Sequence, residues 1–214
     1  MTENKLILTL FGATGDLASR KLYPAIYRLY KNGHLSKHFA LIGTGRTKWS
    51  HEDMRQTVRQ SVAKEVEDAT HLEEFLTHMY YLSHDVNDKA HYQNLKAFQA
   101  ELDQQYQTDG NRIFYISLSP TLFPTITLHL KTEGLITENG YNRLIIEKPF
   151  GHDTESAQEL QQKLNQAFDE DQIFRIDHYL GKEMVQAIRN IRFDNRLFSD
   201  IWNNKGIDHF QISL

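Results

Sequence analysis

Short apolar runs alternate along the chain with longer segments in which apolar residues recur every three or four positions. The runs, rich in β-branched and aliphatic residues, predict strands at Lys5–Phe11, Phe39–Gly43, Met79–Leu82, Arg112–Ser117, Asn142–Glu147, Gln172–Ile176 and Asp208–Leu214. Strands that alternate with helices predict a parallel sheet wound by right-handed crossovers. We therefore expect an α/β fold with a Rossmann-like, doubly wound and mostly parallel sheet.

The segments between the strands have helical patterns. One helical face is formed in 88–105 by Tyr92, Leu95, Phe98 and Leu102, and in 153–168 by Ala157, Leu160, Leu164 and Phe168. Asp153 or Thr154 is available as the N-cap of the second of these helices. Leu17–Tyr30 is also helical in pattern, but proline fits a first turn and breaks a helix interior. Pro24 therefore predicts that a second helical piece begins there.

The organisation changes after about Arg175. The strand there leads directly into a predicted helix, Lys182–Arg192, and then to the last strand, 208–214. We expect residues 1–177 to form one domain and residues 178–214 to be the beginning of a truncated second α+β domain. In the alternative interpretation, the last strand simply closes the sheet.

Composition excludes several classes of site and partner. The chain of 214 residues is 40% hydrophobic and 24% charged, which is enough apolar material for a sizeable core. It has no cysteine, so disulfides and thiolate chemistry are excluded, and we expect no metal site. A formal net charge of −4 argues against a nucleic-acid partner. The first apolar run is too short for a signal peptide or a membrane span, and we expect a cytoplasmic protein. Histidines such as His71, His78 and His91 are expected on helix surfaces.

The first predicted strand leads into a glycine-containing loop, Gly12-Ala13-Thr14-Gly15-Asp16-Leu17-Ala18, and then into a helix. This order matches a variant of the dinucleotide fingerprint. In that fingerprint the first glycine permits a tight turn and the second lets the backbone approach a pyrophosphate, while a small third residue such as Ala18 keeps the helix close to the sheet. The amide groups at the helix start then meet the phosphates. The alternative is an ordinary turn from strand to helix.

The end of the second strand indicates which dinucleotide the loop binds. NAD-specific folds usually have an acidic residue there, whereas an arginine accommodates the 2′-phosphate of NADP. This strand is followed by Arg46, Thr47 and Lys48, with no acidic residue. We therefore expect NADP, with NAD as a possible secondary coenzyme. The alternative is that these cations only face solvent.

Two further segments combine reactive side chains. Lys148 follows the strand Asn142–Glu147, at the sheet edge where open α/β folds bind ligands, and Pro149 is a candidate for a cis peptide bond. In the second segment, 175–182, His178, Tyr179 and Lys182 are able to present hydrogen-bond donors to one phosphate group. The alternative is that the histidine and tyrosine pack between domains and the lysine faces solvent.

Taken together, these segments resemble glucose-6-phosphate dehydrogenase, especially its bacterial members. The resemblance rests on the glycine loop, on Glu147-Lys148-Pro149-Phe150-Gly151 and on Arg175-Ile176-Asp177-His178-Tyr179-Leu180-Gly181-Lys182, and it covers essentially the whole chain. It implies NADP-dependent oxidation of glucose 6-phosphate at C1 to 6-phosphogluconolactone, in the oxidative pentose phosphate pathway. A histidine is suited to take the hydroxyl proton, because its pKa lies near the working pH.

The resemblance also implies individual roles. Gly12, Ala13, Thr14, Gly15, Asp16 and Leu17 would line the pyrophosphate, Arg46 and Thr47 would bind the 2′-phosphate, and Asp85 and Val86 would lie near the adenine or ribose. Lys148 would contact both coenzyme and sugar. His178, Tyr179 and Lys182 would hold the sugar phosphate, and Lys21 would point into the same crevice. Asp177 would orient a general-base histidine.

That histidine belongs, in the family, to a larger C-terminal domain through which members form homo-oligomers. We expect this chain to lack it, because the chain ends at Leu214, before the stretch that would hold it in the family. His178 suits a phosphate instead, and His209 is the other candidate but has no matching role in the family. We therefore expect the chain to bind NADP but turn over poorly. Two alternatives stay open. One is a non-catalytic NADP-binding module. The other is a different sugar oxidoreductase with the Glu-Lys-Pro signature, which activity on unphosphorylated sugars would favour.

Overall fold

The computed structural model describes residues 4–35 and 37–211. The chain divides into two compact units, Met1–Arg175 and Ile176–Leu214, close to the boundary that the sequence predicts. The first unit contains a parallel sheet with helices on both faces, and the second consists of short helices and turns. No helix in the described ranges is long and apolar enough to cross a membrane.

The sheet has six strands: β1 (Leu6–Phe11), β2 (Phe39–Gly45), β3 (Met79–Ser83), β4 (Arg112–Ile116), β5 (Asn142–Glu147) and β6 (Ile173–Ile176). Their order across the sheet is β3-β2-β1-β4-β5-β6, and the pairs from β3 through β5 are parallel. The strand order reverses between β1 and β4, which is the pattern of a doubly wound fold. The predicted Rossmann-like α/β class is therefore confirmed.

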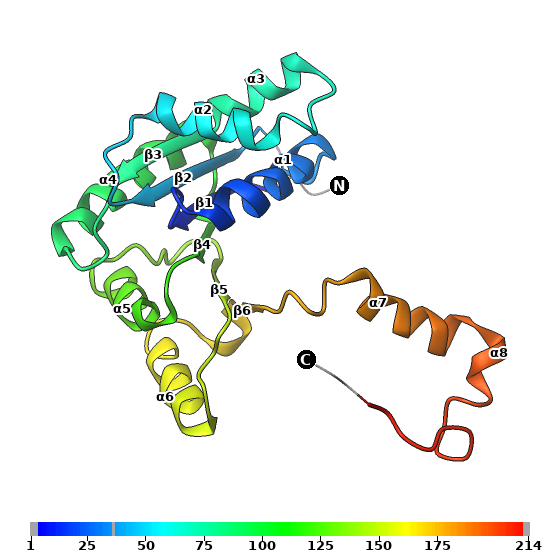
Figure 1. Ribbon diagram of the computed structural model, residues 1–214. Coiled ribbons are helices and arrows are strands. Elements are labelled where there is room, and N and C mark those ends of the chain that lie inside the picture. The colour runs from blue at the N-terminus through cyan, green and yellow to red at the C-terminus, as the bar shows by residue number, and fades with distance from the viewer. Residues whose placement is uncertain (1–3, 36, 212–214) are drawn as a thin grey trace. The chain divides into compact units, whose positions relative to one another are not determined.

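The helices cover the sheet in two layers (Figure 1). One face carries η1 (Ala18–Leu22), α1 (Tyr23–Lys31), α2 (His51–Val62) and α3 (Ala69–Thr77). The other carries α4 (Lys89–Tyr106), α5 (Phe123–Thr132) and α6 (Thr154–Leu164), with the short turns η2 (Pro120–Leu122) and η3 (Glu170–Gln172) between elements. Pro24 lies in the first turn of α1, after the π-helical turn η1, and this confirms the predicted break.

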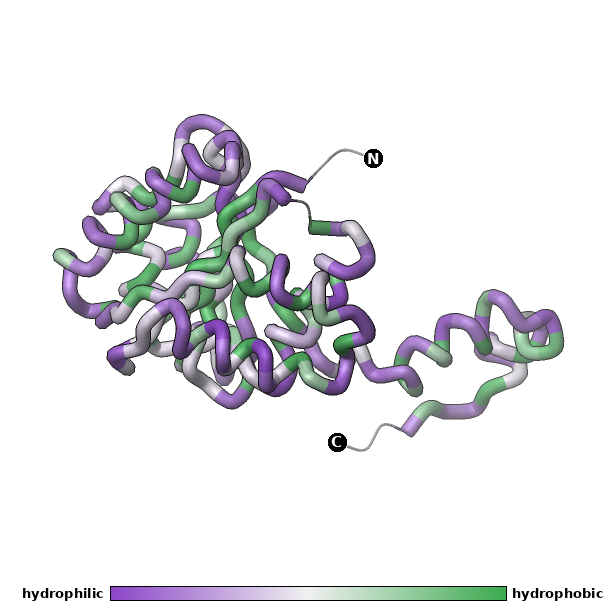
Figure 2. The backbone as a smooth tube through the Cα atoms, turned by 90° about the horizontal axis from the view of Figure 1, so that it is seen from above, coloured by the Kyte–Doolittle hydropathy of each residue, from purple (hydrophilic) through white to green (hydrophobic). Residues whose placement is uncertain are grey.

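Alternate residues of β1 belong to two separate cores. Ile7 and Phe11 pack with apolar residues of α4, α5 and α6. Leu6, Leu8 and Leu10 pack with apolar residues of α1, α2 and α3. Figure 2 shows the resulting concentration of hydrophobic residues along the strands of the first unit. Burial on both faces explains why these strands are continuous apolar runs rather than alternating ones.

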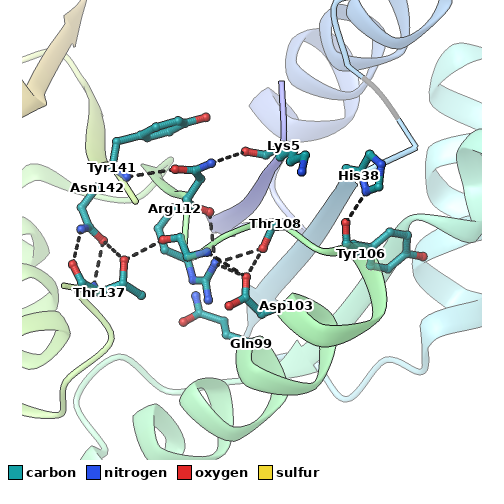
Figure 3. A network of polar contacts seen from close by, with 12 residues as sticks. Lys5, His38, Gln99, Asp103, Tyr106, Thr108, Arg112, Thr137, Tyr141 and Asn142 are labelled. Carbon is teal, nitrogen blue, oxygen red and sulfur yellow. Dashed lines mark hydrogen bonds and ion pairs between the residues drawn. The ribbon is translucent and has the colours of Figure 1, made fainter. Parts of the chain in front are cut away.

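A polar network joins the amino ends of the strands (Figure 3). Arg112 is buried at the start of β4 and donates to the Asp103 carboxylate at 3.0 Å, and the same carboxylate accepts from the Thr108 hydroxyl and from the Gly110 amide. Asn111 links two strands, because its amide nitrogen donates to the Lys5 carbonyl and its amide oxygen accepts from the Tyr141 amide, both at 3.0 Å.

The two turns beside this network require glycine. Gly110 and Gly140 have φ of +76° and +84°. A Cβ on Gly110 would lie 2.2 Å from the Asn139 carbonyl oxygen, and one on Gly140 would lie 2.7 Å from the Asp109 carbonyl oxygen. The turns at Gly110-Asn111 and Asn139-Gly140 therefore pack directly against each other.

One predicted surface histidine belongs to the core. His71 is exposed, as expected, but His78 is buried at the end of α3, and its Nδ1 lies 2.6 Å from the Phe39 carbonyl oxygen. Burial lowers the pKa of His78, so the neutral ring is favoured. The surface interpretation of His78 was wrong because rings of Tyr30, Phe39 and Tyr106 from other elements surround it, which local pattern does not reveal.

The second unit contains α7 (Glu183–Arg189), the π-helical turn η4 (Asn190–Asp194) and α8 (Arg196–Ser199). The predicted helix Lys182–Arg192 thus exists, but its last part is π-helical. The predicted strand 208–214 is wrong over residues 208–211, which are irregular, and residues 212–214 lie outside the described ranges. A strand needs a neighbouring ladder for its backbone groups, and within the described part of this unit there is none.

Candidate functional site

The glycine loop is held against the neighbouring strand by its first two amide groups. Gly12 and Ala13 both donate to the Thr44 carbonyl oxygen at 3.0 Å. Gly12 has φ of +92°, and a Cβ there would lie 2.5 Å from the Ser117 carbonyl oxygen. Ala18 is fully buried at the start of η1, so the helix lies close to the sheet as the fingerprint predicts. The loop therefore turns sharply at the end of β1 and leads directly into a helix.

The later part of the loop, at the start of η1, has backbone amides that are able to bind an anion. The amides of Gly12, Ala13 and Gly15 are already bonded, so the loop donors that remain for an anion are the amides of Thr14, Asp16 and Leu17. Leu17 precedes η1 without forming a side-chain cap, and an uncapped helix start attracts anions. The buried Tyr23 hydroxyl, on α1, donates to the Ala13 carbonyl oxygen at 2.5 Å and so ties the loop to that helix.

A cleft of about 640 Å³ opens beside the loop, at the carboxyl ends of β1, β2 and β3. It is lined by these residues that the sequence assigns to coenzyme binding: Gly12, Thr14, Arg46, Thr47, Asp85 and Val86. Of the other assigned residues, Ala13 is fully buried and the Asp16 carboxylate pairs with Arg20 at 3.2 Å on the surface. Gly15 donates to the Gly12 carbonyl oxygen at 3.0 Å within the loop.

The segment after β2 holds Arg46 and Thr47 at the rim of this cleft. Tyr81 on β3 donates its hydroxyl to the Thr47 carbonyl oxygen at 2.8 Å, and its ring lies 5.4 Å from that of Trp49. Burial raises the pKa of Tyr81 to about 12, so the hydroxyl remains a donor. Ser50 then begins α2 with a capping box to Asp53. Tyr81 positions the segment, and sequence reasoning missed it.

One of the predicted residues, Asp85, places a carboxylate in the cleft. Asp85 follows β3, and its Oδ1 accepts from the backbone amide of Asn87 at 3.0 Å and from the Asn87 side chain at 3.2 Å. These hydrogen bonds, and to a smaller degree the charge of Arg46, lower the pKa of Asp85. The second strand ends without an acid, as the sequence indicates, but a carboxylate from the third strand lines the same cleft as Arg46.

His84 also lines the cleft, although sequence reasoning gave it no role. Its side chain is 1% exposed, and neither ring nitrogen has a hydrogen-bond partner within the described part of the chain. Burial, followed by the charge of His91, lowers its pKa from 6.5 to about 4. The available signal was its place two residues after the predicted strand Met79–Leu82, next to Asp85.

Lys148 is exposed at the carboxyl end of β5, two strands away from the glycine loop. The peptide bond between Lys148 and Pro149 is cis, which confirms that prediction. Glu147 before it is buried and accepts a hydrogen bond from the Tyr115 hydroxyl. Burial and this carboxylate raise the pKa of Tyr115, so the phenol stays protonated.

The second unit brings its predicted phosphate ligands into one turn. The Asp177 carboxylate accepts from the Tyr179 amide at 2.9 Å, and the Lys182 ammonium lies 4.1 Å from the centre of the Tyr179 ring. Three further backbone hydrogen bonds close the turn, with Leu180, Gly181 and Lys182 as donors. Asp177 thereby orders the segment that carries His178, Tyr179 and Lys182.

Lys21 lies in a different hollow from the predicted coenzyme residues. With Arg20, Arg28 and Lys64 it lines a space of about 680 Å³ between the first helices and α2. The structure therefore brings Arg46, Thr47, Asp85 and Val86 together with the loop. Lys21 lines a separate hollow of the first unit, and its place beside the sugar phosphate stays a prediction.

The sequence and the fold of this chain are both similar to those of known proteins. Residues 9–187 match the family model described as glucose-6-phosphate dehydrogenase, NAD binding domain. The chain is 50% identical over 212 residues to glucose-6-phosphate 1-dehydrogenase of Streptococcus pneumoniae, covering 99% of this chain and 43% of that protein. It is 49% identical to the enzyme of Leuconostoc mesenteroides, covering 100% and 44%. A solved glucose-6-phosphate dehydrogenase in complex with glucose-6-phosphate superposes with a TM-score of 0.84 at 40% identity, covering 95% of this chain and 42% of that one.

Proposed function

The chain belongs to the glucose-6-phosphate dehydrogenase family, and from this membership we propose that its first unit binds NADP. The observation that carries the proposal is the single cleft lined by both the glycine loop and Arg46. A dinucleotide needs an anion-binding helix start for its pyrophosphate, and a 2′-phosphate needs a cation near the end of the second strand.

The groups in the cleft fit this ligand. The amides of Thr14, Asp16 and Leu17, at the uncapped start of η1, would hold the pyrophosphate. Arg46 would pair with the 2′-phosphate in a bidentate contact, with the Thr47 hydroxyl as a further donor. Asp85 and Val86, which line the same cleft, would lie near the adenine or ribose. NAD would bind more weakly, because it lacks the 2′-phosphate that Arg46 would bind.

The substrate of the proposed reaction is glucose 6-phosphate, which the compared solved structure contains. His178, Tyr179 and Lys182 would donate to its phosphate, and Lys148 would contact sugar and coenzyme together and so align them. Asp177 would orient a general-base histidine that removes the proton of the C1 hydroxyl. When bound, NADP supplies the hydride acceptor.

The chain spans about 43% of the length of the curated relatives it matches. We accordingly assign coenzyme binding to this chain, together with some of the groups that bind the phosphate of the substrate. His209 is poorly suited to be the base, because it is exposed in an irregular segment that does not fix its position.

Titration with NADPH, followed by the change in coenzyme fluorescence, tests the proposal on the 214-residue chain. We expect saturable binding that NADP displaces more readily than NAD. A parallel steady-state assay with glucose 6-phosphate and NADP should give little turnover. Absence of coenzyme binding would contradict the proposed function, and turnover comparable to an ordinary dehydrogenase would contradict the assignment of only part of the reaction.

A further inference from the structure

His84 is an exception to the rule that buried polar groups are paired. Its side chain is 1% exposed, and both ring nitrogens are buried without a hydrogen-bond partner among the described residues. Leaving a buried donor or acceptor unpaired destabilises a fold, and such groups in native proteins call for an explanation. His84 also lines the cleft that holds Arg46. This combination points to a ligand rather than to packing.

The polar groups around the ring are engaged elsewhere. The Nδ1 of His91 accepts from the Asp85 amide at 2.8 Å, and the Tyr92 hydroxyl donates to the Val86 carbonyl oxygen at 2.9 Å. Three aromatic rings pack around the ring of His84: its centre lies 4.6 Å from that of Tyr92, 5.8 Å from that of His91 and 5.7 Å from that of Phe11. The neighbouring side chains hold the imidazole in place without satisfying its nitrogens.

The position of the ring indicates which part of a ligand it would meet. Phe11, which His84 touches edge-on, immediately precedes Gly12 of the pyrophosphate loop. The backbone amide of His84 donates at 2.8 Å to the carbonyl oxygen of Gly45, which immediately precedes Arg46. His84 is thus fixed between the pyrophosphate side of the cleft and the 2′-phosphate side. In NADP the group between these two phosphates is the adenosine ribose.

We propose that the imidazole of His84 binds a hydroxyl group of the adenosine ribose and thereby positions the adenosine half of the coenzyme. This inference rests on the proposed NADP function. A neutral imidazole has one donor and one acceptor, which matches a hydroxyl group, since a hydroxyl also donates and accepts. The low pKa of His84 keeps the ring in this neutral form at physiological pH. Because the two ring nitrogens point in different directions, one hydroxyl group pairs with one of them, either as acceptor from the N–H or as donor to the bare nitrogen. A phosphate oxygen only accepts and would pair with the N–H nitrogen alone.

His84→Phe tests the proposal, because phenylalanine keeps the ring contacts and removes both nitrogens. We expect the affinity for NADP to fall about tenfold, the upper range for one hydrogen bond. The affinity for 2′,5′-ADP, which contains the adenosine half alone, should fall by the same factor. The melting temperature of the ligand-free chain should rise by about 3 °C, because the unpaired groups are gone. His84→Gln, which keeps one donor and one acceptor, should retain affinity within about threefold of the parent chain.

His129→Phe is the matched control. His129 is also buried, has an unpartnered Nδ1 and packs against the same Tyr92 ring at 4.9 Å, but it does not line the cleft. This variant should change stability without changing NADP affinity. Equal NADP affinity of the parent and His84→Phe would overturn the proposal and leave a structural role, with a buried water as the partner. Loss of NADP affinity without loss of 2′,5′-ADP affinity would overturn the assignment to the adenosine half. If the parent chain fails to bind NADP, the proposed function itself fails.

Discussion

The two ends of the same strands differ in how their polar groups are used. At the amino ends, Asp103 accepts three hydrogen bonds and one of its donors is the buried Arg112 (Figure 3). At the carboxyl ends, His84 is buried without partners and Arg46 forms no ion pair with a described residue. The amino-end groups stabilise the fold, and the carboxyl-end groups, we propose, are held in place for a ligand. Variants at the two ends should therefore separate stability from coenzyme affinity.

The largest effect is expected at the amino end. Asp103→Asn leaves the buried Arg112 guanidinium without a counter-charge, and breaking such a pair costs about 3–5 kcal/mol of unfolding free energy. Urea denaturation measures this loss, and NADP affinity of the folded protein should stay unchanged. Asp109→Asn is the control, because its ion pair with Lys5 is exposed and contributes less than about 1 kcal/mol. Similar losses in the two variants would contradict the importance of the buried pair.

The next effect concerns pH and His84. Its pKa is about 4 in the folded chain and 6.5 as the ordinary value, mainly because burial disfavours the charged ring. Between these values the unfolded chain binds a proton that the folded chain does not, so acidification favours unfolding. The contribution of His84 is complete above pH 6.5 and falls by up to about 3 kcal/mol toward pH 4. Urea denaturation at several pH values should show a steeper loss on acidification in the parent than in His84→Phe, because buried His78 contributes equally to both proteins. Parallel curves for the two proteins would refute the assignment to His84.

A smaller effect is expected at the rim of the cleft. Tyr81→Phe removes the hydrogen bond to the Thr47 carbonyl, which is worth about 1 kcal/mol, and loosens the segment that carries Arg46. NADP affinity should fall about threefold, measured by NADPH fluorescence. Tyr80→Phe is the matched control, since the Tyr80 hydroxyl bonds the Tyr106 hydroxyl at 2.8 Å, away from the cleft. If Tyr80→Phe weakens coenzyme binding as much as Tyr81→Phe does, the hydrogen bond from Tyr81 to Thr47 is not what positions the segment that carries Arg46.

The sequence allowed the sheet and its phosphate loop to be predicted for a physical reason. Strands buried on both faces are continuous apolar runs, and Pro24 marks a helix start by its fixed geometry. The predicted cleft residues Gly12, Arg46 and Asp85 share one pocket because the carboxyl ends of parallel strands meet at one edge.

Features that depend on distant partners could not be predicted. His84 and His78 are buried by rings from other elements. The residues next to a histidine in the sequence do not show whether distant rings bury it. The predicted strand over residues 208–211 failed for a related reason, since an apolar run forms a strand only beside another strand. The hollow that contains Lys21 arises between two helices whose packing the local pattern does not specify.

The most direct test of the account is the NADP and NAD affinity of Arg46→Ala compared with the parent chain, measured by calorimetric titration. If Arg46 binds the 2′-phosphate, the variant loses a charge-assisted contact worth about 1.5–3 kcal/mol, so NADP affinity should fall at least tenfold. NAD affinity should change little, because NAD has no 2′-phosphate. Equal NADP affinities of the two proteins, or an equal loss for both coenzymes, would contradict the assignment of this cleft to NADP.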